Sequence, residues 1–366
     1  MVKEELRGLR DKYGDERRTR ILPTEAEDIS EEDLIPEEET LVTISRDGYI
    51  KRLPLDTYRT QKRGGRGVQA ANLKEEDQLA HLFVATTTHY ILFFTNRGRV
   101  YRLKAYEIPQ SSRTARGQHI NNFIQSNSGE RITAILPIKD FKTGGYLVMA
   151  TEYGEIKRTA LENFANLRAS GLIAFDIEEG DNLNWVKHTD GTQEIMMVTA
   201  NGMSIRFEEG DVPARSRVAG GVRGIQLRDP KTKIVADSVV AMDVVSPTSQ
   251  LLVSSEYGFG KRTDLGKYRS QGRGGRGIQT MNVTAKTGKL VDAAVVEPED
   301  RLMALTEHGM ITRMEVKTIR ATDRSTQGVK LINLKEGDRV VTIERLITTE
   351  EVEELVNEQA KQSGGA

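Results

Sequence analysis

The sequence of 366 residues contains no cysteine, which excludes disulfide bonds, cysteine-ligated zinc, iron–sulfur clusters and thiol catalysis. It has a single tryptophan, Trp185, and only 5% aromatic residues. It lacks the run of roughly 18 apolar residues that a membrane-spanning helix requires. Its start is charged and has no apolar core of the kind found in secretory signals. The absence of cysteine also fits a protein of a reducing compartment.

Net charge is also nearly absent, at −1, but this value conceals an uneven distribution. Residues 1–40 sum to about −7 and residues 347–366 to about −4, which leaves about +10 on residues 41–346. The chain is therefore a basic body between two acidic ends. This pattern fits an ordinary solvated surface with acidic tails, and it equally fits a body that binds a polyanion.

A short pattern recurs six times and is the strongest signal in the sequence. It consists of Ser or Thr, two residues, Gly, three residues and Arg, and its glycines lie 48 to 56 residues apart. The copies are SRDGYIKR (45–52), TNRGRVYR (95–102), TEYGEIKR (151–158), TANGMSIR (199–206), SEYGFGKR (255–262) and TEHGMITR (306–313).

Each copy lies between two segments that are typical of β-strands. The segments before the glycines, such as YILFFT and EIMMVT, are apolar, rich in β-branched residues and too short for helices. The glycine supplies the positive φ that a tight hairpin needs. Further apolar runs bring each repeat to about four strands, so six repeats predict an all-β, radial array of six blades. Kelch and helical solenoid patterns are missing, and one tryptophan excludes a WD-repeat pattern.

A glycine-containing loop with arginines follows each hairpin. The six loops read QKRGGRG (61–67), QSSRTARG (110–117), LRASG (167–171), ARSRVAGGVRG (214–224), QGRGGRG (271–277) and DRSTQG (323–328). At one position in six blades, they are expected to share one rim. The rim arginines are Arg63, Arg66, Arg113, Arg116, Arg168, Arg215, Arg217, Arg223, Arg273, Arg276 and Arg324.

These loops have the composition of a phosphate-binding surface. Glycine-rich backbone exposes N–H groups, and arginine adds forked donors that match phosphate oxygens. Such contacts bind a nucleic-acid backbone without reading bases, and the scarcity of aromatic residues disfavours stacking on single strands. The loops therefore predict binding to duplex DNA. For the weakly charged loops 167–171 and 323–328, a plain blade connection is an equally good interpretation.

The arginines that end the repeats allow two interpretations. They could face the rim and contact phosphate, or they could bridge blades by donating to backbone carbonyls. These residues are Arg52, Arg102, Arg158, Arg206, Arg262 and Arg313.

We expect no catalysis, metal or cofactor in this chain. Gly272, Gly274 and Gly277 match GxGxxG, but without the strand–helix context and the acidic residue that a dinucleotide site requires. The five histidines show no metal-ligand spacing, and no nucleophile is paired with a base.

The first loop carries a specific family signature. Residues Gln61, Lys62, Arg63, Gly64, Gly65, Arg66 and Gly67 match the heptapeptide called the GyrA box, Q-(R/K)-R-G-G-(R/K)-G. With six blades around this box, the body resembles the C-terminal domain of the A subunit of bacterial DNA gyrase. The resemblance implies a six-bladed β-pinwheel, a propeller-like disc whose blades share a strand. It implies these parts: residues 1–22, the end of the upstream helical breakage–reunion domain; 23–40, an acidic linker; 41–346, the pinwheel; and 347–366, an acidic tail.

The resemblance also implies a function. Members of this family bind duplex DNA around a basic edge without sequence specificity and wrap it as a positive crossover, which enables ATP-dependent negative supercoiling by gyrase, a type II DNA topoisomerase. Carried over, residues 61–67 are expected to bind DNA, helped by the other rim arginines. The catalytic tyrosine, ATP and Mg²⁺ belong to other domains of the enzyme. The expected partners are duplex DNA, the rest of gyrase A, and gyrase B in an A2B2 assembly. The expected location is the bacterial cytoplasm, at the nucleoid, and the isolated chain is expected to be a monomer.

Several alternatives stay open at the level of sequence. The near-box at 271–277 has Gly272 where the box has a basic residue, so it is either an auxiliary contact or a decayed copy. The corresponding C-terminal domain of topoisomerase IV, which lacks an intact box, is the runner-up within the class. A protein-interaction propeller and an RGG-type RNA binder are the alternatives from other classes. The acidic tail is expected either to be free or to fold back onto the body.

Overall fold

The computed structural model describes residues 2–14, 34–45, 47–54, 79–112, 115–127, 129–142, 144–168, 170–229, 231–232, 234–246, 248–308 and 310–346. The chain divides into two units, residues 1–36 and 37–366. In the first unit, helix α1 (Val2–Tyr13) has acidic residues in its first turn and basic residues in its last. This order complements the helix dipole. The GyrA box at 61–67, Arg113 and the tail 347–366 lie outside the described residues.

The second unit is built from strands. The hairpin strands are β1 (Glu39–Ser45) with β2 (Tyr49–Pro54), β4 (Tyr90–Thr95) with β5 (Arg99–Lys104), β8 (Tyr146–Thr151) with β9 (Glu155–Ala160), β12 (Glu194–Thr199) with β13 (Met203–Glu208), β16 (Gln250–Ser255) with β17 (Phe259–Asp264), and β20 (Arg301–Thr306) with β21 (Ile311–Glu315). The inner strands are β3 (Leu79–Thr86), β7 (Ile132–Ile138), β11 (Leu183–Thr189), β15 (Val239–Val245), β19 (Leu290–Val296) and β23 (Val340–Leu346). The outer strands are β6 (Gln118–His119), β10 (Leu172–Ile173), β14 (Val222–Arg223), β18 (Ile278–Gln279) and β22 (Val329–Lys330). The 3-10 helices are η3 (Ala105–Glu107), η4 (Ile120–Asn122), η5 (Leu161–Phe164), η6 (Glu209–Asp211), η7 (Leu265–Lys267) and η8 (Val316–Thr318).

These strands form six antiparallel sheets, and each sheet is one blade. In the described residues, five sheets have four strands and the sixth has three. From inside to outside, the first blade reads β3-β1-β2-β6, and the next four repeat this arrangement. The outer strand comes from the following repeat, because β6 lies beyond the hairpin of the second repeat and yet pairs with β2. The sequence-based prediction of a six-bladed all-β fold whose blades share a strand is therefore confirmed.

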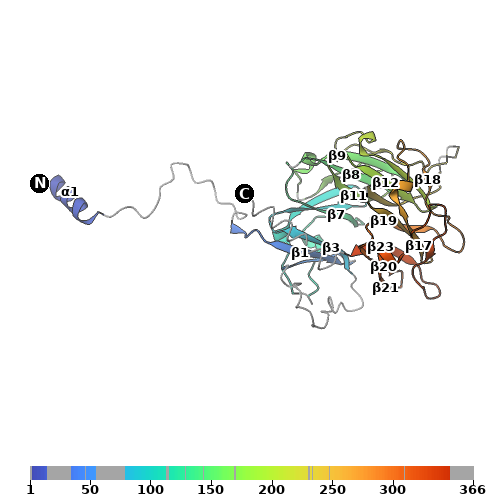
Figure 1. Ribbon diagram of the computed structural model, residues 1–366. Coiled ribbons are helices and arrows are strands. Elements are labelled where there is room, and N and C mark those ends of the chain that lie inside the picture. The colour runs from blue at the N-terminus through green and yellow to red at the C-terminus, as the bar shows by residue number, and fades with distance from the viewer. Residues whose placement is uncertain are drawn as a thin grey trace, which may run out of the picture. The chain divides into compact units, whose positions relative to one another are not determined.

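The inner strands hold consecutive blades together. They contact one another in order from β7 to β23, and Figure 1 shows β7, β11, β19 and β23 toward the middle of this unit. Carboxylates join some of them: the backbone N–H of Val295 donates to Asp243 at 3.1 Å, and that of Ile343 donates to Asp292 at 3.0 Å. Strands β9, β17, β18 and β21 lie nearer the outside of the unit (Figure 1).

The constant spacing within the repeat is explained by the hairpin turn. In the second blade, the Gly98 N–H donates to the Thr95 carbonyl at 2.9 Å, and the Arg99 N–H donates to the Thr95 hydroxyl at 3.3 Å. Gly98 has φ +70°, and the equivalent glycines in the other described turns are also left-handed. Ser or Thr caps the turn and glycine closes it, so both are required at this spacing.

The hydrophobic core is divided into clusters that lie between consecutive blades. The cluster between the first two blades joins Val42 and Ile50 to Ile91 and Phe93, and four further clusters continue in order to the sixth blade. Because neighbours cover both faces of a blade, the first hairpin strand is apolar at successive positions, as in YILFFT. Ile91 to Phe94 are completely buried.

Candidate nucleic-acid interface

Among the described residues, the loop after each hairpin from β4–β5 to β20–β21 crosses to the preceding blade and leads into its outer strand. We call these segments the rim loops; the described ones cover 110–117, 167–171, 214–221, 271–277 and 323–328 within the described residues. Their first residues bond to the preceding blade: the Arg215 N–H donates to the Arg158 carbonyl at 2.9 Å, and the Gln271 N–H to the Arg206 carbonyl at 2.9 Å. The rim loops therefore connect consecutive blades and are held to the preceding blade by backbone hydrogen bonds.

A tight turn with arginine as its second residue shapes the rim loops. In loop 214–221 the Ala219 N–H donates to the Ser216 carbonyl at 3.2 Å, and in loop 323–328 the Thr326 N–H donates to the Asp323 carbonyl at 3.3 Å. Arg217 and Arg324 are the second residues of these turns. When the loops are aligned on their last glycine, the sequence places Arg63, Arg113 and Arg273 at the same position. In loop 167–171 the arginine, Arg168, lies one residue nearer to the last glycine.

The last glycine of a rim loop is required by the strand beside it. Gly277 has φ +73°, and a Cβ there would lie 2.2 Å from the Ser204 carbonyl oxygen. A Cβ at Gly328 would lie 2.5 Å from the Gly260 carbonyl oxygen. The composition of the loops suggests that their glycines expose N–H groups to phosphate. At these positions their role is instead to let the loop enter the outer strand.

Substituting Gly277 with alanine is expected to lower the free energy of unfolding by about 1–3 kcal/mol, because the left-handed backbone and the close carbonyl both exclude a side chain. Gly272 in the same loop has open space around its Cβ position. Gly272→Ala is the matched control and should change stability by less than about 0.5 kcal/mol. Chemical denaturation monitored by circular dichroism measures both. Equal effects of the two variants would contradict this role.

Two rim loops are bonded to the chain that follows the outer strand of the preceding blade. The Gly274 N–H donates to the Gly224 carbonyl at 2.6 Å, and the Gln226 N–H donates to the Gly275 carbonyl at 2.8 Å. Further along the chain, the Asn282 N–H donates to the Thr326 carbonyl at 3.1 Å. The rim is thus pre-ordered where these bonds occur, which reduces the entropy that a ligand must remove on binding.

The predicted rim arginines fall into two groups. The exposed ones are Arg116, Arg168, Arg215, Arg223 and Arg276. The half-buried ones are Arg217, Arg273 and Arg324, at the second position of the turn. Arg273 donates to the carbonyls of Asp211 and Arg223 at 2.8 and 3.0 Å, and Arg324 donates to that of Gln279 at 3.2 Å. These two help to build the rim. The side chains of the exposed group are accessible to solvent, although Arg116 pairs with Asp47 and Arg215 donates to the Gly220 carbonyl.

Four of the arginines that end the repeats, Arg52, Arg102, Arg206 and Arg262, donate to carbonyls of the next blade, whereas Arg158 lies 4.0 Å from Glu209. Arg52 donates to the Ile108 carbonyl at 2.7 Å, and Arg262 donates to the Ile319 carbonyl at 2.6 Å. Arg206 donates to the carbonyls of the next blade and forms an ion pair with Glu194. This ion pair lowers the pKa of Glu194. Of the two interpretations, bridging therefore holds for these four arginines.

Arg206→Met is expected to lower the free energy of unfolding by about 2–4 kcal/mol, because it leaves the half-buried Glu194 and two carbonyls without their donor. Arg97→Met, at an exposed turn position, should change stability by less than about 0.5 kcal/mol. Urea unfolding provides the measurement. A stable Arg206→Met variant with a reduced salt dependence of DNA binding would instead assign Arg206 to phosphate.

Sequence reasoning missed two completely buried lysines, Lys157 and Lys261. Each directly precedes the arginine of its repeat, as Lys51 does in the first repeat. Their ammonium groups donate to rim-loop carbonyls. The sequence did show a lysine within a strand segment that is otherwise buried. The alternation of side chains along a strand, however, did not indicate whether the lysine side chain faces solvent or the neighbouring blade.

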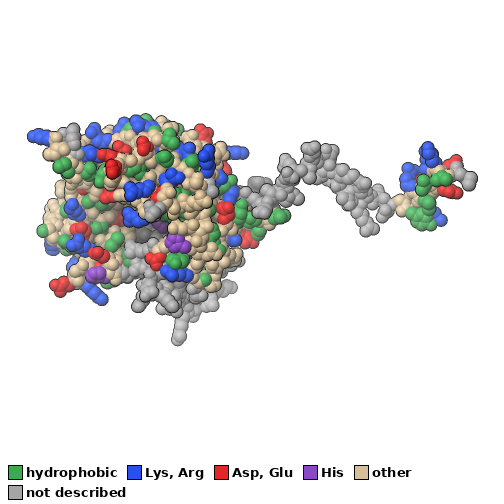
Figure 2. Space-filling view, turned by 180° about the vertical axis from the view of Figure 1, so that it is seen from behind, with side chains coloured by type: hydrophobic (Ala, Val, Ile, Leu, Met, Phe, Trp, Pro, Cys, Tyr) green, Lys and Arg blue, Asp and Glu red, His purple; other side chains and the backbone are tan. Residues whose placement is uncertain are grey.

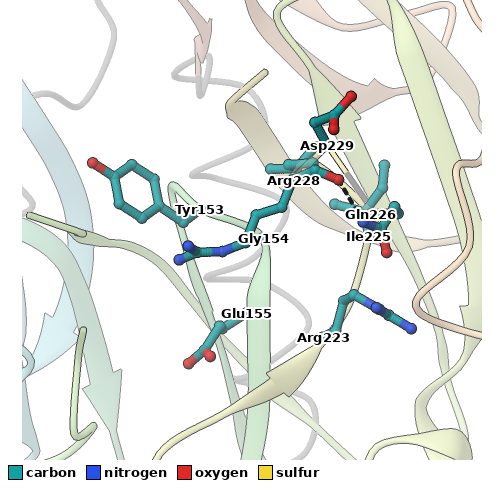
Figure 3. A pocket seen from close by; sticks show the side chains of 9 residues that line it. Tyr153, Gly154, Glu155, Arg223, Ile225, Gln226, Arg228 and Asp229 are labelled. Atoms are coloured by element: carbon teal, nitrogen blue, oxygen red, sulfur yellow. Dashed lines mark hydrogen bonds between the residues drawn. The ribbon is translucent and has the colours of Figure 1, made fainter. Parts of the chain in front are cut away.

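A pocket of about 160 Å³ lies between the turn of the β8–β9 hairpin and the chain that follows β14. Figure 3 shows the Arg228 side chain extending toward Tyr153 from the opposite wall, with Glu155 below. Arg228 also pairs with Glu178. The lining carries charges of both signs, and in the described part of the chain no three His, Cys, Asp or Glu side chains are grouped to hold a metal.

Lys and Arg side chains are numerous along the upper margin of the propeller unit in Figure 2, with acidic side chains among them. No described helix is both long and apolar enough to span a membrane.

The family model of the DNA gyrase C-terminal domain, beta-propeller, matches the chain in six segments: 39–86, 89–139, 145–190, 193–246, 249–297 and 300–346. Each segment corresponds to one blade hairpin and its inner strand. The chain belongs to this family. The family assignment covers the whole propeller, and the predicted resemblance to gyrase A is confirmed.

Among curated relatives, the A subunit of DNA gyrase from Mycolicibacterium smegmatis is 42% identical over 360 residues, covering 98% of this chain and 42% of that protein. The A subunit of DNA gyrase from Deinococcus deserti is 43% identical over 345 residues, covering 93% of this chain and 42% of that protein. The chain therefore spans about two fifths of the length of these relatives.

Two solved structures show the same fold. The C-terminal domain of DNA topoisomerase IV has a TM-score of 0.76 and 27% identity, covering 90% of this chain and 99% of that one. A DNA gyrase A C-terminal domain has a TM-score of 0.66 and 24% identity, covering 85% of this chain and 100% of that one. The sequence similarity to gyrase A therefore rests on the curated relatives and on the family match, and these two structures support the fold.

Proposed function

We propose that the propeller binds duplex DNA around its rim and bends it, without reading its sequence. The observation that carries this proposal is the repeated rim loop. A turn with arginine at its second position occurs in loops 214–221 and 323–328, and backbone bonds join rim loops to the chain that follows the outer strand of the preceding blade. Phosphates also recur at regular intervals along a duplex, so a repeated cationic loop suits the DNA backbone.

We further propose that residues 61–67 are the principal contact. They lie outside the described residues, so the support is sequence: the loop has the spacing of 271–277 and one additional basic residue, Lys62, at the position of Gly272. In the described near-box, Arg276 is exposed and Arg273 braces the loop. By this comparison, Lys62 and Arg66 would reach phosphate while Arg63 would brace the loop.

Bending requires many phosphate contacts. Curving a site of roughly 20–30 bp costs about 1–6 kcal/mol, and a longer arc costs more. If about eight phosphates are neutralised, the logarithm of the binding constant should fall with the logarithm of salt concentration with a slope near −7. Because no base is read, DNAs of different sequence should bind with similar affinity.

Fluorescence energy transfer between the ends of a linear duplex tests this proposal. Binding should shorten the end-to-end distance and should weaken steeply with salt. An unchanged distance would refute bending. Preferential binding to single-stranded RNA would favour an RGG-type role, and binding only to an acidic protein would favour an interaction module.

At the level of the whole enzyme, we propose that wrapping by this domain enables gyrase, with its B subunits and at the expense of ATP, to introduce negative supercoils. The relatives that are A subunits of DNA gyrase, together with the box at 61–67, support gyrase over topoisomerase IV. The proposal assigns ATP, Mg²⁺ and bond breakage to other domains, and it places the assembly in the bacterial cytoplasm. Supercoiling rather than relaxation alone is the activity that separates the two enzymes.

A further inference from the structure

We propose that the buried side chains of Lys157 and Lys261 hold two rim loops in their DNA-binding shape, and that Lys51 does so at the first blade. We call these three lysines the pins. The proposal rests on the proposed function, since it assigns positioning residues to the DNA-binding rim. These lysines do not themselves touch DNA.

The strongest observation is the surroundings of Lys157. Its side chain is completely buried, and its ammonium donates to three backbone carbonyls, those of Ala174, Arg217 and Ala219, each at 2.7 Å. Only lysine offers three donors from one compact group, so it can satisfy three converging carbonyls at once. Two of the three belong to loop 214–221, and the third lies just beyond the neighbouring loop.

The same arrangement recurs in alternate blades. Lys261 donates to the carbonyls of Asp323 and Arg324 and, at 3.2 Å, to the Thr326 hydroxyl, so it holds loop 323–328. Lys51 donates to the Ala115 carbonyl at 2.6 Å and so holds loop 110–117. The three lysines occupy one position of the repeat, on the second hairpin strand of the first, third and fifth blades.

The second and fourth blades fix their loops in another way. Tyr101 takes the lysine position in the second blade, and its neighbour Arg99 donates to the Ser170 carbonyl at 2.8 Å. Ile205 takes that position in the fourth blade, where Arg273 braces the glycine-rich loop 271–277. In these two blades an arginine holds the rim loop where a lysine holds it in the others. We infer that each of these loops needs a cationic side chain beneath it, whichever residue supplies it.

Drawing the carbonyls inward leaves the opposite side of the turn available. Among the described residues, the backbone N–H groups of Arg217 and Val218 donate to no backbone carbonyl. Successive N–H groups of a turn, beside an exposed cation, suit the binding of an anion such as phosphate. Arg215, exposed on the same loop, donates to the Gly220 carbonyl at 3.2 Å and so depends on the loop shape.

A buried ammonium is costly unless it is well paired, so its retention needs a reason. Burial lowers the pKa of Lys157 and of Lys261 to about 8. Both are therefore still mostly charged at pH 7, with all three donors. The charged groups facing them are Asp176, Arg215 and Arg217 at Lys157, and Asp323, Arg324 and Lys267 at Lys261.

A double-mutant cycle between Lys157 and Arg215 tests the proposal. Lys157→Met and Arg215→Ala should each lower the affinity for a duplex about tenfold, and each should reduce the salt slope by about 1. Together they should lower affinity little more than Lys157→Met alone, because Arg215 is already misplaced when the pin is lost. Lys142→Met, at an exposed position between β7 and β8, removes the same charge and should be additive with Arg215→Ala.

Full additivity of Lys157→Met with Arg215→Ala would overturn the pin, and so would unchanged binding by Lys157→Met. Wild-type protein that does not bind duplex DNA would instead refute the proposed function. If Lys157→Met does not fold, the cycle is repeated with Lys51→Met and Arg116→Ala, since Lys51 is only half-buried. The same non-additivity is expected there, and additivity would again overturn the proposal.

A pH titration supplies a second readout. Between pH 7 and 9 the wild-type affinity should fall more than that of Lys157→Met/Lys261→Met, because each pin loses a proton and a donor. Stability should change in the opposite direction: the unfolded lysines keep their protons to about pH 10.5, so deprotonation of the native pins raises the free energy of unfolding from about pH 8 upward. Parallel pH profiles of wild type and double variant would overturn the proposal.

Discussion

Changing Lys62, Arg63 and Arg66 to alanine in full-length gyrase A, assembled with gyrase B, is expected to reduce negative supercoiling at least about 100-fold. Three cationic side chains leave the loop proposed as the principal contact, so the DNA segment is no longer wrapped. Relaxation and decatenation need no wrapped segment and should persist. The box glycines are retained because the last glycine of the sister loop is needed by the adjoining strand.

The sister loop supplies the control for this experiment. Arg273→Ala/Arg276→Ala changes the equivalent arginines of the near-box, which lacks the additional basic residue. We expect a partial loss of supercoiling, roughly tenfold, with the same retention of relaxation. A box variant that supercoils at the wild-type rate would show that 61–67 is not the principal contact. Equal loss of all activities would indicate misfolding instead.

Arg223→Ala/Arg276→Ala is expected to weaken duplex binding by the isolated propeller about 10- to 100-fold at moderate salt. Both side chains are exposed on the rim, so each loss removes about one phosphate contact and together they lower the salt slope by about 2. Fluorescence anisotropy over a salt series gives affinity and slope together.

The matched control is Arg131→Ala/Arg339→Ala. These residues are also exposed but directly precede the inner strands β7 and β23. The control has the same net charge as the rim variant, and it should bind within about threefold of wild type, with nearly the same slope. If both pairs weaken DNA binding equally, overall charge rather than the rim accounts for affinity.

The hairpins could be predicted from the sequence because their signals are local. Ser or Thr, the left-handed glycine and the apolar strand lie within one repeat, and each acts on its own neighbours. The family resemblance added that blades share a strand. The presence of arginines in the rim loops could also be predicted from the sequence, because the loops recur at a fixed place after the hairpins.

The roles of individual residues could not be predicted because they depend on a neighbouring repeat. Arg206 bridges to carbonyls of the next blade, Gly277 lies against Ser204, and Lys157 reaches carbonyls in loop 214–221. In each case the partner is more than 50 residues away. Alternation along a strand shows that neighbouring side chains differ in direction, but it does not show what a neighbouring blade places opposite them.

The central claim, that this propeller bends duplex DNA around its rim, is tested most directly by topology. Nicked circular DNA is ligated in the presence of the propeller, the protein is removed, and the trapped linking difference is measured. We predict a positive difference that grows with the number of propellers per circle and that decreases in Arg223→Ala/Arg276→Ala. A distribution of linking numbers identical to that of DNA ligated without protein would contradict the claim.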